Sequence, residues 1–243
     1  MIIPFSFPHL PNVDCYFQMR SDIQGTSDNI SFECGLDKEE TVYARQRLFE
    51  ELKITQYCEL LQVHGTDTIY SPIIYDSCVQ ETTLQEGDGI ATDKKNIALL
   101  IKTADCQPIL VADSSGTYIM ALHVGWRGNS RQYIQKAISE FCTVYSVAPE
   151  TLYVVRGPSL SPPVSEFIHA RDEFSADDMS FYDIETKTMD LWSMTQAQLI
   201  ASGVLNTHIY GVDLCTFSSP FLFSYRRASH TGRQASIIII RAS

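Results

Sequence analysis

Residues 97–124 read IALLIKTADCQPILVADSSGTYIMALHV, and this stretch decides the fold. It holds three apolar runs of strand length, at 97–101, 108–112 and 118–122. Continuous apolar runs of this length are typical of strands that are buried on both faces. The last two runs are separated by Asp-Ser-Ser-Gly at 113–116, which favours a hairpin turn. The stretch therefore predicts neighbouring strands in the interior of a sheet.

Helices and further strands flank this stretch on both sides. Asp37, followed three residues later by Glu40, resembles a capping box at the start of a helix. Helices are predicted from caps and from apolar residues at helical spacing, over about 37–53, 131–145 and 190–203. Further strands are predicted from short apolar runs, at 59–63, 151–155 and 237–240. This alternation favours an α+β fold with mixed sheets, in one domain that covers residues 1–243.

Composition narrows the class of partner and the compartment. The chain has 243 residues and a net charge of −11, which argues against a nucleic-acid partner because binding to the phosphate backbone needs basic patches. An anionic substrate would need a local cluster of arginines. No apolar run approaches the ~20 residues that span a bilayer, and the start of the chain has no features of a signal peptide. We therefore expect a cytoplasmic protein with no membrane partner.

The cysteines point to the same compartment. There are seven of them, widely scattered and without a Cys-x-x-Cys pair. An odd, scattered set in a chain with this much apolar sequence argues against a disulfide framework. Most of these cysteines are expected to be small buried hydrophobic residues in a reducing cytosol.

Three short polar motifs stand at the expected strand ends: QVHG at 62–65, TADCQP at 103–108 and HVGWRG at 123–128. Each offers one metal ligand, which is His64, Cys106 or His123. Two imidazoles and a thiolate make a three-ligand zinc set, and a fourth position left to water would make the site catalytic. The gaps between the three residues are too long for a local zinc signature. Two structural histidines and a packed cysteine therefore remain the alternative interpretation.

Taken in order, these motifs resemble those of the YfiH-like family, also called the polyphenol oxidase or laccase-domain family. The resemblance covers nearly the whole chain, through further similar segments at 17–20, 29–35, 87–89, 157–166, 223–227 and 231–233. It implies mixed β-sheets sandwiched with outer helices, a fold related to the catalytic domain of cytotoxic necrotising factors. It also implies zinc at His64, Cys106 and His123, with copper as a possible substitute. The implied activity is phosphorolysis of adenosine, inosine, guanosine and methylthioadenosine, with adenosine deamination alongside.

The chain departs from the family pattern close to these motifs. Glu33 stands where the family usually has His, Leu36 where it has Asp, and Ala44 where it has Asn. The three metal ligands are intact. The departures therefore concern how the substrate is bound.

Residue chemistry suggests roles for the other matching positions. Arginine suits phosphate because its planar fork matches two oxygens at once, so Arg45 and Arg127 are the first candidates for phosphate, with Arg226 behind them. Gln62 is a further candidate for substrate binding. Asp88, or a zinc-bound water, is the candidate general acid–base. The alternatives are surface salt bridges for the arginines and a simple Gly-Asp-Gly turn for Asp88.

Functions of other classes use the same residues. Cys106 could be the nucleophile of a metal-free hydrolase or amidase that edits peptidoglycan precursors, with His123 or His64 as its base. A copper-dependent polyphenol oxidase is a poorer fit, because six histidines in the whole chain are too few for a multicopper centre. A non-catalytic metal-binding or partner-binding protein is the third alternative. The expected partners are purine nucleosides and phosphate, and the expected assembly is a monomer or a small homo-oligomer.

Overall fold

The structure is a computed structural model that describes residues 1–23, 25–78 and 84–242, and two mixed β-sheets form its centre. The five-stranded sheet has the order β1 (Ile2–Ser6), β2 (Val13–Gln18), β13 (Gln234–Ile240), β6 (Ile97–Thr103) and β3 (Gln56–Cys58). The six-stranded sheet has the order β12 (Ile209–Gly211), β9 (Leu152–Arg156), β7 (Gln107–Asp113), β8 (Ile119–Val124), β5 (Gly89–Thr92) and β4 (Thr68–Ile69). The pairs β3–β6, β4–β5 and β9–β12 are parallel, and the other pairs are antiparallel.

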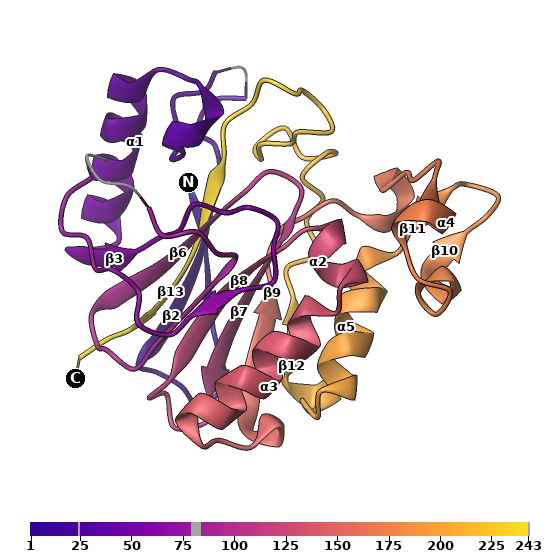
Figure 1. Cartoon of the computed structure of the whole chain (residues 1–243). Helices are drawn as coiled ribbons and strands as arrows, with labels where there is room; N and C mark the ends of the chain where they lie inside the picture. The colour runs from indigo at the N-terminus through magenta and orange to yellow at the C-terminus, as the bar shows by residue number, and fades with distance from the viewer. Residues whose placement is uncertain (24, 79–83, 243) are drawn as a thin grey trace.

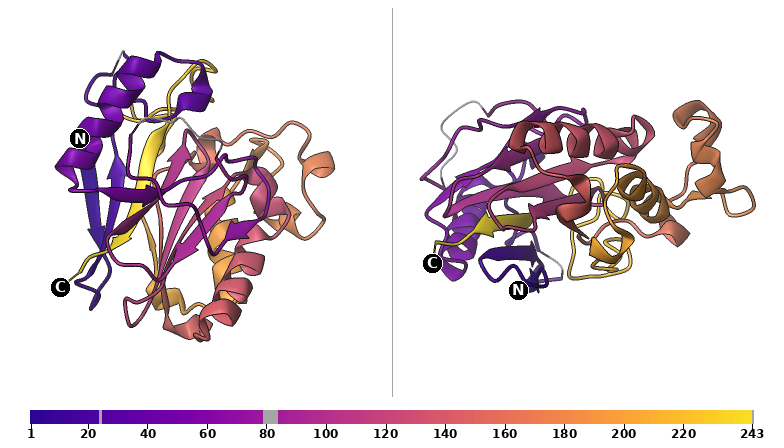
Figure 2. Two further views of the ribbon diagram at one scale, coloured as in Figure 1. Left: turned by 60° about the vertical axis from the view of Figure 1, so that its left-hand side comes forward. Right: turned by 90° about the horizontal axis from the view of Figure 1, so that it is seen from below.

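The helices lie outside the two sheets, and the longer ones cover the outer faces (Figure 1, Figure 2). They are α1 (Lys38–Glu51), α2 (Trp126–Ser130), α3 (Tyr133–Tyr145), α4 (Ala170–Glu173) and α5 (Leu191–Ala201). Short 3₁₀ turns lie at η1 (Phe32–Cys34), η2 (Pro149–Thr151), η3 (Pro162–Val164), η4 (Asp178–Phe181) and η5 (Asn206–His208). The predicted class of mixed sheets sandwiched with outer helices is confirmed.

Strand β6 shows why the apolar runs decide this arrangement. Every residue of β6 is buried. Leu99 and Ile101 belong to the apolar core that both sheets share, whereas Leu100 packs on the other side with Leu48 and Phe49 of α1. A strand between two apolar layers carries apolar residues on both faces, so it reads as a continuous run rather than an alternating one. On the far side of the molecule, α3 covers β7 and β8 with a similar apolar face.

A small arm projects beyond the second sheet, next to α2 (Figure 1). It contains α4, η4 and the hairpin of β10 (Tyr182–Asp183) and β11 (Thr188–Met189). Its own apolar cluster includes Phe167 and Phe174, and Trp126 at the start of α2 packs against both rings. The arm is thereby fixed beside the HVGWRG motif.

The expected turns and helix ends are confirmed in detail. The amide of Gly116 donates to the carbonyl of Asp113 at 2.9 Å, which closes the predicted hairpin between β7 and β8. The Asp37 carboxylate accepts from the amide of Glu40 at 2.9 Å and caps α1. Asp190 caps α5 in the same way. Gly203 follows the end of α5 with a φ of +93°, a conformation that glycine adopts at little cost.

One predicted strand is wrong in its bounds, and one helix was not predicted. The strand expected at 59–63 is not present; β3 lies just before it and ends at Cys58, and within 59–63 only Leu61 makes an isolated bridge, to Glu86. The helix expected over 131–145 is confirmed as α3, whereas the short helix α2 before it, which begins within the HVGWRG motif, was not predicted. Gln132 separates them with a φ of +54°, which interrupts helical geometry.

Two broader expectations are also addressed by the structure. All seven cysteines are free thiols. None of the helices in the described part of the chain is long and apolar enough to cross a bilayer.

Candidate functional site

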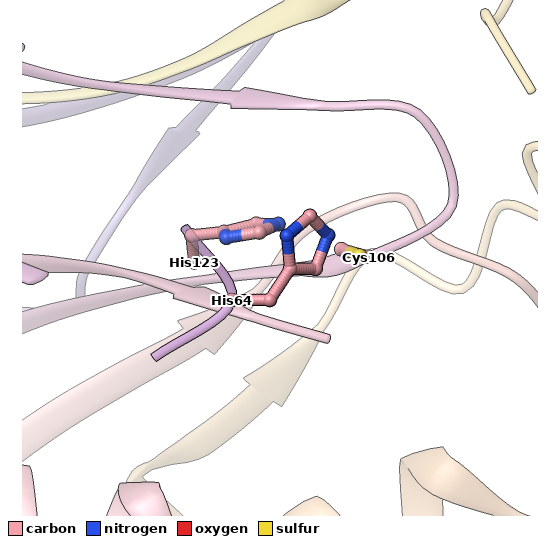
Figure 3. A group of neighbouring side chains, drawn as sticks. All are labelled: His64, Cys106 and His123. Atoms are coloured by element: carbon pink, nitrogen blue, oxygen red, sulfur yellow. The ribbon is translucent and has the colours of Figure 1, made fainter. Parts of the chain in front are cut away.

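The three predicted metal ligands lie together. His64 is in the loop that follows β3, Cys106 is in the turn between β6 and β7, and His123 is in β8. Their ligand atoms are all within 4.8 Å of one another, and the two imidazole rings meet edge to face at 78° (Figure 3). All three residues line a cavity of about 830 Å³. This volume lies within the range of ~300–1,000 Å³ that is typical of small-molecule sites.

Special backbone geometry brings the three side chains together. His64 has a φ of +57° and Asp105, just before Cys106, has a φ of +96°. Non-glycine residues adopt such values at a cost, and do so chiefly where the surrounding structure fixes a functional geometry. Gly125 supplies the space, since a β-carbon there would lie 3.1 Å from Cys106 Sγ and 3.2 Å from His64 Cδ2. The glycine of the third motif is therefore explained by the close approach of two ligands.

Asp88 holds two of the three ligands in place. Its fully buried carboxylate lies 2.7 Å from His123 Nδ1 and accepts hydrogen bonds from the amides of His64 at 3.0 Å and Gly65 at 2.6 Å. Burial alone would raise the pKa of Asp88, but the hydrogen bond from His123 and the backbone donors keep it below the ordinary value. Asp88 therefore stays ionised, and Nε2 of His123 is the nitrogen left to act as a ligand.

The position of Asp88 also bears on its expected role as general acid–base, which stays a prediction. The carboxylate does not line the cavity, and its oxygens accept donors from the His64 loop and from His123. A general acid–base must reach the proton that it transfers. In this geometry the contacts of Asp88 are those of a residue that positions His123 and the His64 loop.

Cys106 and His123 form a coupled acid–base pair when no metal is bound. Burial alone would raise the pKa of Cys106, but His123 and His64 oppose it and lower the pKa to about 6. Burial alone would lower the pKa of His123, but Cys106 and Asp88 raise it to about 9. At neutral pH the thiolate and imidazolium forms are therefore favoured. A thiolate is both the metal-ligating and the nucleophilic form of cysteine.

In protein freed of metal by a chelator, we expect iodoacetamide to alkylate Cys106 with a pH midpoint near 6. The reason is that alkylation requires the thiolate, whose fraction rises as the pH increases through the pKa. Cys58 should stay unreactive at neutral pH, because burial raises its pKa to about 12. Timed alkylation between about pH 5 and 9 followed by peptide mass spectrometry measures both rates. A Cys106 midpoint at the value of an ordinary thiol, about 8.5, would contradict the prediction.

Asp105 links the Cys106 turn to the C-terminal part of the chain. Its carboxylate accepts from the hydroxyl of Thr216 and from the amide of Arg226, both at 2.6 Å. Its carbonyl accepts from the amide of Leu160 at 2.9 Å. Sequence reasoning quoted Asp105 only as part of a motif. The sequence signal for this anchoring role is the place of Asp105, an acidic residue directly before the candidate ligand Cys106.

Two of the predicted phosphate ligands lie at the cavity and keep their guanidinium groups available. Arg127 stacks on the Trp126 ring, with its central carbon 4.3 Å from the ring centroid. Arg226 donates to the carbonyl of Glu166 at 3.1 Å. Both arginines line the cavity, as does Arg233, which sequence reasoning did not consider for this purpose. None of the three has an ion pair with a carboxylate within the described ranges.

Arg45 does not lie at the cavity, and its expected role in phosphate binding is not supported. Its guanidinium is fully buried under η1, 2.6 Å from a carboxylate oxygen of Glu59, and it donates to the carbonyl of Ile30 at 2.8 Å. Aromatic rings of Phe32 and Tyr57 flank it at 5.2 Å. A buried carboxylate requires a paired cation, and Arg45 is that cation for Glu59.

We expect Arg45→Met to lower the free energy of unfolding by about 3–5 kcal/mol, because it leaves Glu59 with one fewer buried partner. The KM for phosphate of the folded fraction should stay unchanged. Urea denaturation measures the first quantity, and steady-state kinetics at varied phosphate measures the second. An unchanged stability with a raised KM for phosphate would restore the binding role.

Gln62 also has a structural bond pattern, although it lines the cavity. Its side-chain amide donates to the carbonyl of Lys102 at 2.7 Å, and its side-chain oxygen accepts from the amide of Lys102 at 2.8 Å. The two bonds attach the His64 loop to β6 where regular strand pairing has ended. The amide is therefore engaged with the backbone, and the substrate-binding role expected of Gln62 stays a prediction.

Comparisons with known proteins agree with the site. Residues 19–241 match the family model described as "Multi-copper polyphenol oxidoreductase laccase". A Shigella flexneri protein named purine nucleoside phosphorylase YfiH is 28% identical over 218 residues, which are 86% of this chain and 85% of the relative. A Geobacillus stearothermophilus protein named purine nucleoside phosphorylase YlmD is 30% identical over 235 residues, with 86% and 82% covered.

The fold agrees equally well with a solved relative. The crystal structure of YlmD from Geobacillus stearothermophilus has a TM-score of 0.83 and 26% sequence identity, and the match covers 97% of this chain and 94% of that chain. The family match spans all three ligand motifs. The chain therefore belongs to the family described as multi-copper polyphenol oxidoreductase laccase, which confirms the resemblance to YfiH-like proteins seen in its motifs.

Proposed function

We propose that this protein is a zinc-dependent purine nucleoside phosphorylase of the cytoplasm. The observation that carries the proposal is the His64–Cys106–His123 group in a cavity that Arg127 and Arg226 also line. Relatives named purine nucleoside phosphorylase support the substrate class. The free thiols suit the reducing cytosol.

The residues present fit a metal ion. Two imidazole nitrogens and a thiolate are a preferred donor set for zinc, and three protein ligands leave one position for a small molecule. Asp88 supplies the carboxylate that commonly orients a ligating histidine. A zinc ion held by His64, Cys106 and His123 would supply Lewis acidity at the wall of the cavity. Copper also accepts imidazole and thiolate ligands, so metal analysis of the purified protein must accompany any assay.

The protein's own residues would position phosphate for the reaction. In phosphorolysis a phosphate oxygen forms a bond to C1′ of the ribose, and the bond from C1′ to N9 breaks. The electron pair of that bond goes to the purine, which takes up a proton, and ribose 1-phosphate is the second product. Arg127 and Arg226 would bind the phosphate through paired N–H donors and hold it against C1′.

The substrates proposed are adenosine, inosine, guanosine and methylthioadenosine. Adenosine deamination is proposed as a second activity, in which water replaces the amino group at C6 and ammonia leaves. The same cavity would then present C6 rather than C1′ to the nucleophile. The His-x-Glu and Pro-Cys-x-x-Cys signatures of zinc nucleobase deaminases are absent from the sequence, so the activity would rest on the three ligands alone.

Product analysis tests this proposal. Purified protein with adenosine and phosphate should yield adenine and ribose 1-phosphate, and omission of phosphate should remove both products. Chromatography separates adenine from inosine. Inosine without adenine would support the deaminase and overturn the phosphorylase. The absence of every product would overturn both activities.

The Cys106–His123 pair supports one second candidate, a hydrolase of amide bonds such as those in peptidoglycan precursors. The lowered pKa of Cys106 gives a nucleophilic thiolate beside an imidazolium that can protonate a leaving group. Metal content separates the two functions. Protein that is active after complete removal of metal would favour the hydrolase, whereas activity that returns only with added zinc would favour the phosphorylase.

A further inference from the structure

A chain of alternating charges leads from the interior of the protein to the cavity. Arg45 pairs with Glu59 at 2.6 Å, Glu59 pairs with Lys102 at 3.1 Å, and Lys102 pairs with Glu33 at 2.9 Å. The side chains of the first three residues are between 0 and 5% exposed, whereas that of Glu33 is 30% exposed. Glu33 and Lys102 both line the cavity that holds the candidate metal ligands. Glu33 is thus the member of this row of paired charges that lies at the cavity and is most exposed.

The Glu33 carboxylate is held in a fixed orientation. One of its oxygens accepts from the Lys102 ammonium, and the other accepts from the hydroxyl of Ser31. Ser31 also caps the 3₁₀ turn that carries Glu33, so backbone and side chain are fixed together. Lys102 is fixed in turn, because its backbone is bonded to Gln62 and its ammonium lies between two carboxylates. Groups oriented in this way lose little conformational entropy when they bind a ligand.

The negative charge of Glu33 favours neutral hydrogen-bond donors over anionic groups as its neighbours. A carboxylate repels phosphate, so we expect phosphate to bind at Arg127 and Arg226 and the neutral part of a nucleoside to face Glu33. Each carboxylate oxygen can accept more than one hydrogen bond, and the pair suits a ligand with two adjacent donors. A purine nucleoside offers two such groups. They are the vicinal hydroxyls of the ribose and the N1–H with the 2-amino group of guanine.

We propose that Glu33, oriented by Lys102 and Ser31, is a specificity residue that binds two adjacent N–H or O–H donors of the substrate. The inference rests on the proposed nucleoside substrate and extends it to a named contact. A site that hydrogen-bonds a substrate group discriminates against analogues that lack that group. Glu33 should therefore set a preference, while Lys102 and Ser31 act as positioning residues.

Equilibrium binding and product formation together test the inference. Titration calorimetry with adenosine, inosine, guanosine and 2′-deoxyadenosine gives the affinities, and the same nucleosides with phosphate give kcat and KM. If Glu33 binds the ribose, the wild-type protein should prefer adenosine to 2′-deoxyadenosine by about 100-fold, and Glu33→Gln should reduce that ratio to within a few-fold of one. If Glu33 binds guanine, the wild-type protein should prefer guanosine to inosine, and Glu33→Gln should bring that ratio to within a few-fold of one.

A matched control separates this effect from a general change of the cavity. Glu173→Gln removes a carboxylate from another part of the same cavity wall and should keep the wild-type ratios. Zinc content should be equal in both variants, since neither residue belongs to the His64–Cys106–His123 group. Equal ratios in the wild type and in Glu33→Gln would overturn the inference.

The outcome is distinguishable from failure of the proposed function. Wild-type protein that binds nucleosides without cleaving them would overturn the phosphorylase, and the binding ratios would still decide the role of Glu33. Wild-type protein that cleaves nucleosides with unchanged ratios in the variant would leave the phosphorylase standing and remove Glu33 from substrate selection. Wild-type protein that binds none of the four nucleosides would overturn both.

Discussion

Replacing His123 by alanine should lower the rate of purine release by at least about 100-fold and remove the bound metal at the same time. Partners that only orient a metal ligand typically contribute 10–100-fold to affinity or activity, so loss of the ligand itself should reach the upper end or exceed it. His123 is also the residue that connects Asp88 with Cys106. No other histidine in the described ranges belongs to the metal-capable group except His64.

The measurement combines metal content with product analysis on the same protein sample. Zinc per chain is determined after purification without added metal, and adenine is quantified after incubation with adenosine and phosphate. His230→Ala is the matched control, because it removes an exposed imidazole that does not line the cavity. A His123→Ala protein that keeps its zinc and still releases adenine would contradict the prediction.

The sequence predicted the layers of the fold because each layer has a local signature. Strand β6 is apolar on both faces because it lies between two apolar layers, and that property is visible in residues 97–101 without any knowledge of contacts. The caps of α1 and α5 are local in the same sense, since Asp37 and Asp190 bond within three residues. The short helix α2 was not predicted, because its five residues are too few to show a helical period of apolar residues.

The grouping of the candidate metal ligands was predictable for a similar reason, whereas the contacts of their neighbours were not. Motifs at strand ends identified His64, Cys106 and His123, and the topology brings those ends together. A motif shows that a residue matters without showing what it touches. Arg45 matches a family position, yet it is buried against Glu59 and does not reach the cavity.

Lys102 illustrates the opposite case, a residue with important contacts that no sequence motif singled out. It directly follows the apolar run at 97–101, and no sequence motif indicates a role for its charge. Its importance comes from Glu33 and Glu59, which are 69 and 43 residues away along the chain and meet it only in the folded protein. Charge pairing between distant segments has no periodicity, so it must be read from the structure.

Asp88→Asn should weaken zinc binding by about 10–100-fold while leaving all three metal ligands in the chain. One carboxylate oxygen lies 2.7 Å from His123 Nδ1 and also accepts from the amide of His64, and the other accepts from the amide of Gly65. An asparagine has a single acceptor oxygen, so its amino group must face one of these donors. If it faces His123, Nδ1 loses its acceptor and the proton can move to the nitrogen that should bind the metal. If it faces Gly65, the loop that carries His64 loses its anchor.

Either orientation of the asparagine harms one ligand, so the expected loss does not depend on which is adopted. Competition with a chromophoric zinc chelator measures the affinity, and thermal unfolding of the metal-free protein reports any accompanying loss of stability. Asp67→Asn is the matched control, because its side chain is 79% exposed and pairs only with Lys136 among the ion pairs of the described ranges. An Asp88→Asn protein with wild-type zinc affinity would show that His123 keeps its tautomer without the carboxylate, and Asp88 would then be a structural residue of the His64 loop alone.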